Sequence, residues 1–188
     1  MEAGAEADRK IRETVMRRRG GTPRFIFRPT SRKADMRIAI ATDHRGLELK
    51  AHLRDGLAAE GHELLDLGSH ETGAVDYPDF AFLLAGKVAS GEAERGILIC
   101  GTGLGMSIAA NKVSGARAAL AYDEDSLRLS REHNDANILV LPGNWLAPEK
   151  ALNWARLWLA TPFEGGRHAR RVDGIAAYDK SRGPAQRA

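Results

Sequence analysis

Residues 96–112, with the sequence GILICGTGLGMSIAANK, constrain the fold more than any other part of this chain. Their first residues form an apolar, partly β-branched run that is typical of a buried strand. A glycine turn, Gly-Thr-Gly-Leu-Gly, follows directly after Cys100, and a helical pattern begins behind it. A strand, a glycine turn and a helix in this order present backbone N–H groups to an anion at the carboxyl edge of a parallel sheet. The stretch therefore predicts an open α/β sheet with a site at residues 100–105.

Short apolar runs alternate with helical patterns along the rest of the chain. Helices between consecutive short strands favour a parallel sheet that is covered on both faces. Trp145, Trp154 and Trp158 are expected on one helix, in the core or at a subunit interface. The predicted strands cover residues 37–42, 63–67, 96–100, 116–120 and 138–141, and the other predicted helices cover residues 47–60, 77–90, 106–110, 123–133 and 165–180.

Composition and length point to one globular domain. The chain has 188 residues and a single cysteine, which cannot form an internal disulfide and favours a reducing cytoplasm. No apolar run approaches the roughly 18 residues of a membrane span, and no signal-peptide core follows the N-terminal charges. We therefore predict a cytoplasmic protein without a membrane partner.

The positive net charge comes from the first 35 residues. These hold ten Lys and Arg against five Asp and Glu, whereas the remaining residues hold 18 against 20. We expect a poorly ordered basic arm at residues 1–35, a domain at residues 36–182 and a flexible tail at residues 183–188. Either Met36 is the native start and the arm is an upstream artefact, or the arm is a functional tail. The mildly acidic remainder disfavours a nucleic-acid partner for the domain.

Side chains capable of chemistry lie beside three of the predicted strands. Asp43 and His44 follow the first strand, Cys100 ends the third, and His133 and Asn134 precede the fifth. Because the tips of parallel strands meet at one edge of the sheet, we expect all these residues to converge there.

Each candidate also has a purely structural interpretation. Cys100 is either a buried apolar filler or a thiolate base stabilised by the N–H groups of the turn. Thr102 is either a turn residue or a hydroxyl ligand of a substrate. His133 either interacts with a helix dipole or acts as a general acid. Arg167 and Arg171, four residues apart, form either a solvated face or a phosphate grip.

The glycine spacing excludes two nucleotide sites. Gly101, Gly103 and Gly105 alternate, and Met106 stands where the dinucleotide fingerprint G-x-G-x-x-G needs its last glycine. A dehydrogenase is therefore disfavoured, and the Gly-Lys-Ser/Thr of a P-loop is missing too. A short pocket for an anion or an enediolate fits better. Scattered histidines and one cysteine predict no metal centre.

Four segments together resemble the ribose-5-phosphate isomerase B family, which also contains the galactose-6-phosphate isomerase subunits. They are Asp43-His44, CGTGLGMSIAANK at residues 100–112, HNDAN at residues 133–137 and GGRHARRV at residues 165–172. The resemblance covers about residues 36–182. It implies a Rossmann-like three-layer α/β/α sandwich with a five-stranded parallel sheet and a C-terminal helical extension. It also implies a homodimer with shared active sites, which in some members pairs into a tetramer, and no metal or organic cofactor.

The implied reaction is the interconversion of ribose 5-phosphate and ribulose 5-phosphate through a cis-enediolate. By this resemblance Cys100 moves the proton between C1 and C2, and His133 opens the furanose ring. Thr102 and the amides of the glycine turn hold the enediolate. The implied substrate-binding residues are Asp43, His44, Gly101, Gly103, Leu104, Gly105, Asn134, Arg167 and Arg171.

Asn144 departs from the family pattern, which usually has a phosphate-binding arginine after the fifth strand. Losing one charge-assisted contact costs about 1.5–3 kcal/mol, or one to two decades of affinity. Asn144 and Trp145 are therefore candidate specificity residues. Allose 6-phosphate, galactose 6-phosphate or a tetrose phosphate are alternative substrates, and a non-catalytic sugar-phosphate-binding protein is an alternative function.

Overall fold

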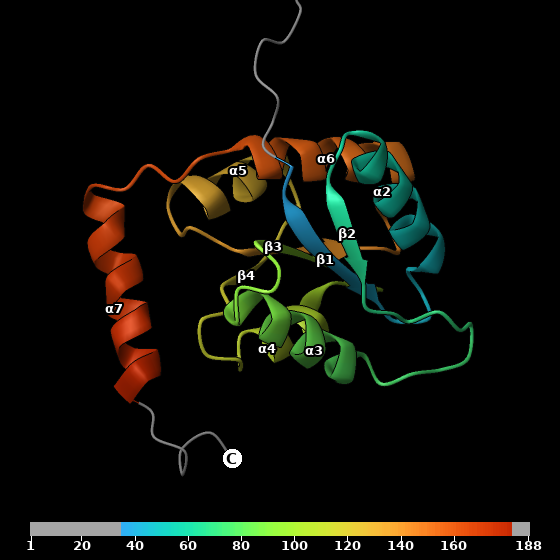
Figure 1. Ribbon diagram of the computed structural model, residues 1–188, viewed down its shortest axis with the longest axis horizontal. Helices are drawn as coiled ribbons and strands as arrows, with labels where there is room; N and C mark the ends of the chain where they lie inside the picture. Colours follow the sequence, from blue (N-terminus) through green and yellow to red (C-terminus); the bar gives the residue numbers. More distant parts are fainter. Residues whose placement is uncertain (1–34, 182–188) are drawn as a thin grey trace, which may run out of the picture. The chain divides into compact units, whose positions relative to one another are not determined.

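The computed structural model describes residues 35–181, drawn in colour in Figure 1. The predicted arm and tail lie outside the described residues, apart from Asp35. The five strands pair in parallel in the order β2-β1-β3-β5-β4. The elements in chain order are β1 (Arg37–Thr42), α2 (Leu47–Ala59), β2 (Glu63–Asp66), α3 (Tyr77–Ala89), β3 (Arg95–Cys100), α4 (Leu104–Ala110), β4 (Ala118–Leu120), α5 (Glu124–Glu132), β5 (Ile138–Pro142), α6 (Pro148–Ala160) and α7 (Arg167–Ser181).

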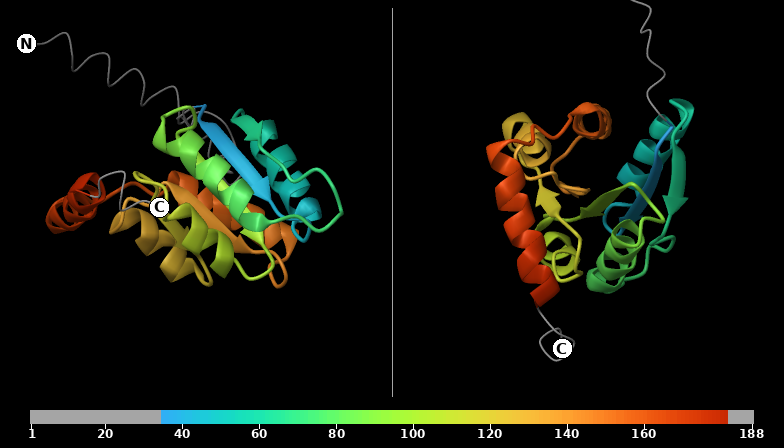
Figure 2. Two further views of the ribbon diagram at one scale, coloured as in Figure 1. Left: turned by 90° about the horizontal axis from the view of Figure 1, so that it is seen from below. Right: turned by 60° about the vertical axis from the view of Figure 1, so that its left-hand side comes forward.

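The helices cover the sheet on both faces, which confirms the predicted three-layer α/β/α sandwich. Figures 1 and 2 show α3 and α4 on one face and α2, α5 and α6 on the other. Alternate residues of the central strands explain this: Ile97 and Ile99 point into one apolar cluster, and Leu98 and Cys100 point into the other. No helix within residues 35–181 is long and apolar enough to cross a membrane.

The strand order contains a reversal at β1, and this reversal positions the site. From β1 the chain moves through α2 to β2 at one edge of the sheet, then through α3 back past β1 to β3. The two connections cover opposite faces, as right-handed crossovers require. The loops that follow β1 and β3 therefore diverge and leave a crevice between them, where ligands bind in open α/β sheets.

The start of α6 corrects the predicted position of Trp145. The helix begins only at Pro148, because the preceding residue Ala147 has an extended backbone (ψ 142°), as expected before a proline. Trp145 therefore lies in the turn after β5 and is 71% exposed, whereas Trp154 and Trp158 on α6 are buried in the core as predicted.

A buried lysine ties the loop after β2 to the end of β1. Lys50 on α2 is 3% exposed, and its ammonium donates to Asp66 Oδ1 at 2.6 Å and to the Ser69 carbonyl at 2.9 Å. The Ser69 N–H in turn donates to the Thr42 carbonyl at 2.7 Å. Burial raises the pKa of the Asp66 carboxyl, but the hydrogen bonds from Lys50 and the Gly68 N–H, together with the Lys50 charge, outweigh it, so the pKa lies below its usual value.

Replacing Lys50 with methionine should strongly destabilise the domain. Asp66 would lose its buried cation and keep only the longer contact with the half-exposed Arg54 at 3.5 Å and the Gly68 N–H. Breaking a buried ion pair of this kind costs about 3–5 kcal/mol. Urea unfolding measures the change. Lys87→Met is the matched control, because its pair with Glu92 is largely exposed and worth at most about 1 kcal/mol. Equal midpoints for the two variants would show that the Lys50 network does not stabilise the fold.

Candidate active site

Cys100 lies at the carboxyl end of β3, in the crevice beside β1. Its side chain is 5% exposed, and its Sγ accepts the Gly103 N–H at 3.2 Å. Gly103 has a φ of +80°, which glycine adopts at little cost, and a Cβ there would overlap Leu120. The turn can therefore fold back over the sulfur only with a glycine at this position. The result is a thiol with a backbone N–H group directed at it.

Thr102 stands at the exposed tip of the same turn. Its Oγ1 accepts the Leu104 N–H at 3.3 Å, so the turn interpretation of this residue holds. The hydroxyl proton is free to point at a bound oxygen, because this bond uses only a lone pair.

Tyr77 is a residue of the site that the sequence analysis missed. A Cβ on Gly105 would lie 2.8 Å from the Tyr77 hydroxyl oxygen, so the ring of this tyrosine packs directly against the glycine turn. Tyr77 begins α3 and is 40% exposed. A sequence signal did exist, since Tyr77 ends the polar loop that follows a strand, but nothing local links it to Gly105.

Asp43 and His44 reach the same crevice from the end of β1. Asp43 is 6% exposed, and its Oδ1 accepts the Arg45 N–H at 2.9 Å in a turn that the aspartate side chain closes. His44 Nδ1 accepts the Val75 N–H at 3.5 Å. The neutral ring therefore carries its proton on Nε2, which leaves a donor for a substrate oxygen.

The turn after β5 is held to the glycine turn at residues 101–105 by main-chain hydrogen bonds. The Gly143 N–H donates to the Cys100 carbonyl at 2.8 Å, and the Asn144 N–H donates to the Gly101 carbonyl at 3.0 Å. The Asn144 side chain lies against Gly101, where a Cβ would come within 3.2 Å of its Nδ2. The Asn144 side chain thus lies against the glycine turn, and its role in specificity stays a prediction.

Trp145 borders a separate, mainly apolar cavity beside the glycine turn. This cavity has a volume of about 340 Å³ and also contacts Thr102, Leu104 and Trp154. Lys150 lies 5.0 Å from the centroid of the Trp154 ring, within the range of a cation–π contact. Trp145 therefore lies next to the site without entering the crevice between β1 and β3.

His133 and Asn134 do not converge with Cys100 in one chain, and that expectation is wrong. They precede β5, whose first residue Ile138 pairs with Gly96 at the start of β3, whereas Pro142 pairs with Cys100 at its end. Residues before a parallel strand lie at the amino edge of the sheet, and only those after it lie at the carboxyl edge. The length of β5, about 3.3 Å per residue, separates the two groups.

His133 stacks on His168 at this amino edge. The two rings are 4° from parallel with centroids 4.0 Å apart, and His168 is 4% exposed. Arg167 Nε donates to His168 Nε2 at 3.1 Å, and Glu164 Oε2 lies 3.8 Å from His133 Nε2. Burial, and then the nearby charges of His133 and Arg167, lower the pKa of the His168 ring.

Two of the histidines, His133 and His168, therefore lie together, whereas the sequence predicted scattered histidines. Ligand atoms of His133, Glu164 and His168 lie within 4.8 Å of one another. Their arrangement opposes a metal ion all the same. A metal binds in the plane of each imidazole, which two parallel stacked rings cannot both offer, and the Arg167 cation already occupies His168 Nε2.

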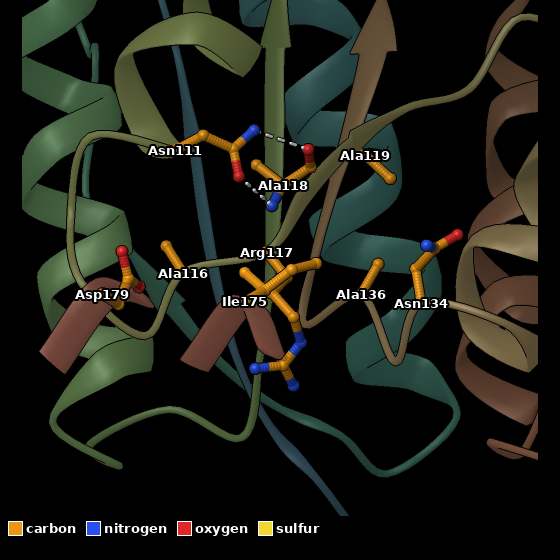
Figure 3. Close-up of a pocket in the computed structure, with 9 residues that line it drawn as sticks. All are labelled: Asn111, Ala116, Arg117, Ala118, Ala119, Asn134, Ala136, Ile175 and Asp179. Atoms are coloured by element: carbon orange, nitrogen blue, oxygen red, sulfur yellow. Dashed lines mark hydrogen bonds between the residues drawn. The ribbon is translucent and has the colours of Figure 1, made fainter. Parts of the chain in front are cut away.

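Asn134 and helix α7 enclose a second cavity, of about 370 Å³, at the amino end of β4 (Figure 3). Asp179 on α7 accepts the Gly115 N–H at 3.0 Å, and Ile175 also lines the cavity. Arg167 and Arg171 lie one turn apart at the start of α7, both exposed. His133 and Asn134 thus lie near the two arginines, at the amino edge of the sheet and away from Cys100.

Comparisons with known proteins agree with this geometry. Residues 38–175 match the ribose/galactose isomerase family. Ribose-5-phosphate isomerase B of Escherichia coli is 42% identical over 78% of this chain and 98% of its own. The solved structure of ribose-5-phosphate isomerase B from Clostridium thermocellum is 50% identical, with a TM-score of 0.75 over 77% of this chain and 98% of that one.

A further solved structure contains a ligand. It is ribose-5-phosphate isomerase B from Mycoplasma genitalium with bound ribulose-5-phosphate, which is 44% identical to this chain with a TM-score of 0.75. It covers 77% of this chain and 97% of its own. With the family match and the shared fold, the conclusion is direct: this chain belongs to the ribose/galactose isomerase family and is an aldose–ketose isomerase.

Proposed function

We propose that this enzyme interconverts ribose 5-phosphate and ribulose 5-phosphate through a cis-enediolate, without a metal or an organic cofactor. The observation that carries the proposal is the buried Cys100 sulfur with the glycine-turn amides beside it. The bound ribulose-5-phosphate of the Mycoplasma genitalium relative supports this choice of substrate. A reaction that depends on a free thiol suits the reducing cytoplasm.

Cys100 serves as the single base for both carbons. Its thiolate removes the proton from C2 of the open-chain aldose, and the C–H electrons form the C1–C2 double bond while the charge moves to O1. The proton on O2 passes to O1, and Cys100 returns its own proton to C1 as the carbonyl forms at C2. The glycine-turn amides and the Thr102 hydroxyl stabilise the charge of the enediolate. Asp43 binds sugar hydroxyls, and His44 faces the phosphate.

A second copy of the chain completes each active site in this proposal. Ring opening needs an acid, and the phosphate needs cations. The acid is His133 and the cations are Arg167 and Arg171, all from the opposite edge of the sheet, where Asn134 also lies. Exposed apolar residues support an interface: Ile108 on α4 is 62% exposed and Tyr178 on α7 is 66% exposed. A two-fold symmetric dimer brings the amino edge of one copy to the carboxyl edge of the other at two equivalent sites.

An isomerisation assay of the full chain tests the substrate. We expect turnover of ribose 5-phosphate to exceed that of allose 6-phosphate, galactose 6-phosphate and erythrose 4-phosphate. Preference for another sugar would make Asn144 and Trp145 the determinants of specificity, since Asn144 lies at the site without a charge. Tight binding without turnover of any of the four would contradict the catalytic proposal and favour a sugar-phosphate-binding protein.

A further inference from the structure

We infer that Arg45 binds the substrate phosphate, as a cation supplied by the same copy of the chain as Cys100. The inference rests on the proposed function and adds to it a residue that the family resemblance does not assign. It places part of the phosphate site at the carboxyl edge of β1 and β5, between Arg45 and Asn144.

The main chain around Arg45 is held by two hydrogen bonds. Its own N–H donates to Asp43 Oδ1 at 2.9 Å, and the Gly46 N–H donates to the Asp43 carbonyl at 3.4 Å. A Cβ on Gly46 would overlap the side chains of Thr42 and Ile99, so this residue must be glycine for α2 to begin so close to the sheet. The turn therefore fixes the direction in which the Arg45 side chain leaves the backbone.

The Arg45 side chain extends over the glycine turn at residues 101–105. A Cβ on Gly101 would lie 3.3 Å from Arg45 Cδ and 3.2 Å from Asn144 Nδ2. Arg45 and Asn144 thus meet above the one residue that separates Cys100 from Thr102. The missing side chain at Gly101 leaves room for both, and it brings a guanidinium and an amide donor to the rim of the crevice.

The Arg45 guanidinium is available for a ligand. Within residues 35–181 it makes no hydrogen bond or ion pair, and the residue is exposed. Glu48 lines the same cavity, of about 200 Å³, without forming an ion pair with it. Arg117, Arg128 and Arg131 differ, because each of them is paired with a carboxylate.

The chemistry of this place suits a phosphate monoester. A guanidinium presents two parallel N–H donors to phosphate oxygens, and the amide of Asn144 adds a neutral donor beside it. The cations at Arg167 and Arg171 would come from the second copy. The phosphate would then be held between the two copies, with Arg45 as the contribution of the copy that carries the base.

Replacing Arg45 with alanine tests the inference. We expect the KM for ribose 5-phosphate to rise by about 10–100-fold with little change in kcat, because a contact distant from the reacting carbons stabilises substrate and transition state alike. Competitive inhibition by inorganic phosphate should weaken by a similar factor. Arg128→Ala removes an exposed arginine on α5 and should change neither constant. Unchanged KM and phosphate inhibition in Arg45→Ala would overturn the inference.

Moving the charge provides the sharper test. In the double variant Arg45→Ala/Asn144→Arg the guanidinium returns to the same point from the other side of Gly101, and we expect phosphate inhibition to recover. If phosphate inhibition is weakened in Arg45→Ala and the added Asn144→Arg substitution does not restore it, the inference that both positions reach the same phosphate is overturned. Calorimetric titration with inorganic phosphate gives the same comparison without turnover. A wild-type chain that binds phosphate through Arg45 but does not isomerise ribose 5-phosphate would refute the proposed function alone.

Discussion

Replacing Cys100 with alanine should lower kcat for isomerisation by about 10²–10⁴-fold, the usual contribution of a general base. The thiol is the group at the carboxyl end of β3 that is able to accept a proton, and the turn that follows it contains glycines, a threonine and a leucine. The substitution removes one small, buried atom, so the circular dichroism spectrum and the urea midpoint should stay close to those of the wild type. Steady-state kinetics measures the loss.

Exchange of the substrate proton with solvent identifies the missing step. In D₂O the Cys100 thiol exchanges its proton with solvent, so the wild-type enzyme should incorporate deuterium at C1 of ribulose 5-phosphate when it starts from ribose 5-phosphate. Cys100→Ala should not, even at long incubation. Cys100→Ser is the matched control, because it keeps an acceptor for the Gly103 N–H but offers a hydroxyl that is not a base at neutral pH. Wild-type turnover in either variant would assign the proton transfer to another residue.

Mixing two inactive variants should restore activity, which is the second large effect we expect. Cys100→Ala lacks the base and His133→Ala lacks the ring-opening acid, so neither homodimer has an intact site. In a random mixture half of the dimers are mixed, and each mixed dimer has one site with both residues. Equal amounts should therefore recover about a quarter of the wild-type activity.

The subunits must be allowed to exchange, for example by dilution from mild denaturant. A mixture of Cys100→Ala with Cys100→Ser, treated in the same way, is the control and should stay inactive. Failure of the first mixture, once mixed dimers are shown by mass spectrometry, would mean that Cys100 and His133 do not serve one site across a dimer.

The alternation of apolar runs and helices was enough to predict the parallel sheet and its two covered faces. The crevice at residues 100–105 was predictable as well, because a glycine turn between a buried strand and a helix typically presents backbone N–H groups to a ligand. Asp43 and His44 followed from the rule that residues after parallel strands share an edge.

The same rule misplaced His133, because it holds for residues after a strand and His133 comes before one. The remaining gaps concern pairs that are distant in sequence. Tyr77 packs on Gly105, and His168 stacks beneath His133 although β5 and α6 separate the two residues in the sequence. No periodicity or spacing within either segment encodes such a contact, since it depends on how helices that are individually predictable pack together.

The main-chain bonds between the turn after β5 and the glycine turn bear on how an enzyme of this kind changes its substrate preference. The Gly143 and Asn144 amides, not their side chains, hold the turn onto Cys100 and Gly101. The side chain at position 144 is thereby decoupled from the geometry of the reaction. We therefore expect substitutions at position 144 to change which sugar phosphate is accepted while the proposed proton transfer at Cys100 is retained, so that a lineage can explore new substrates one residue at a time.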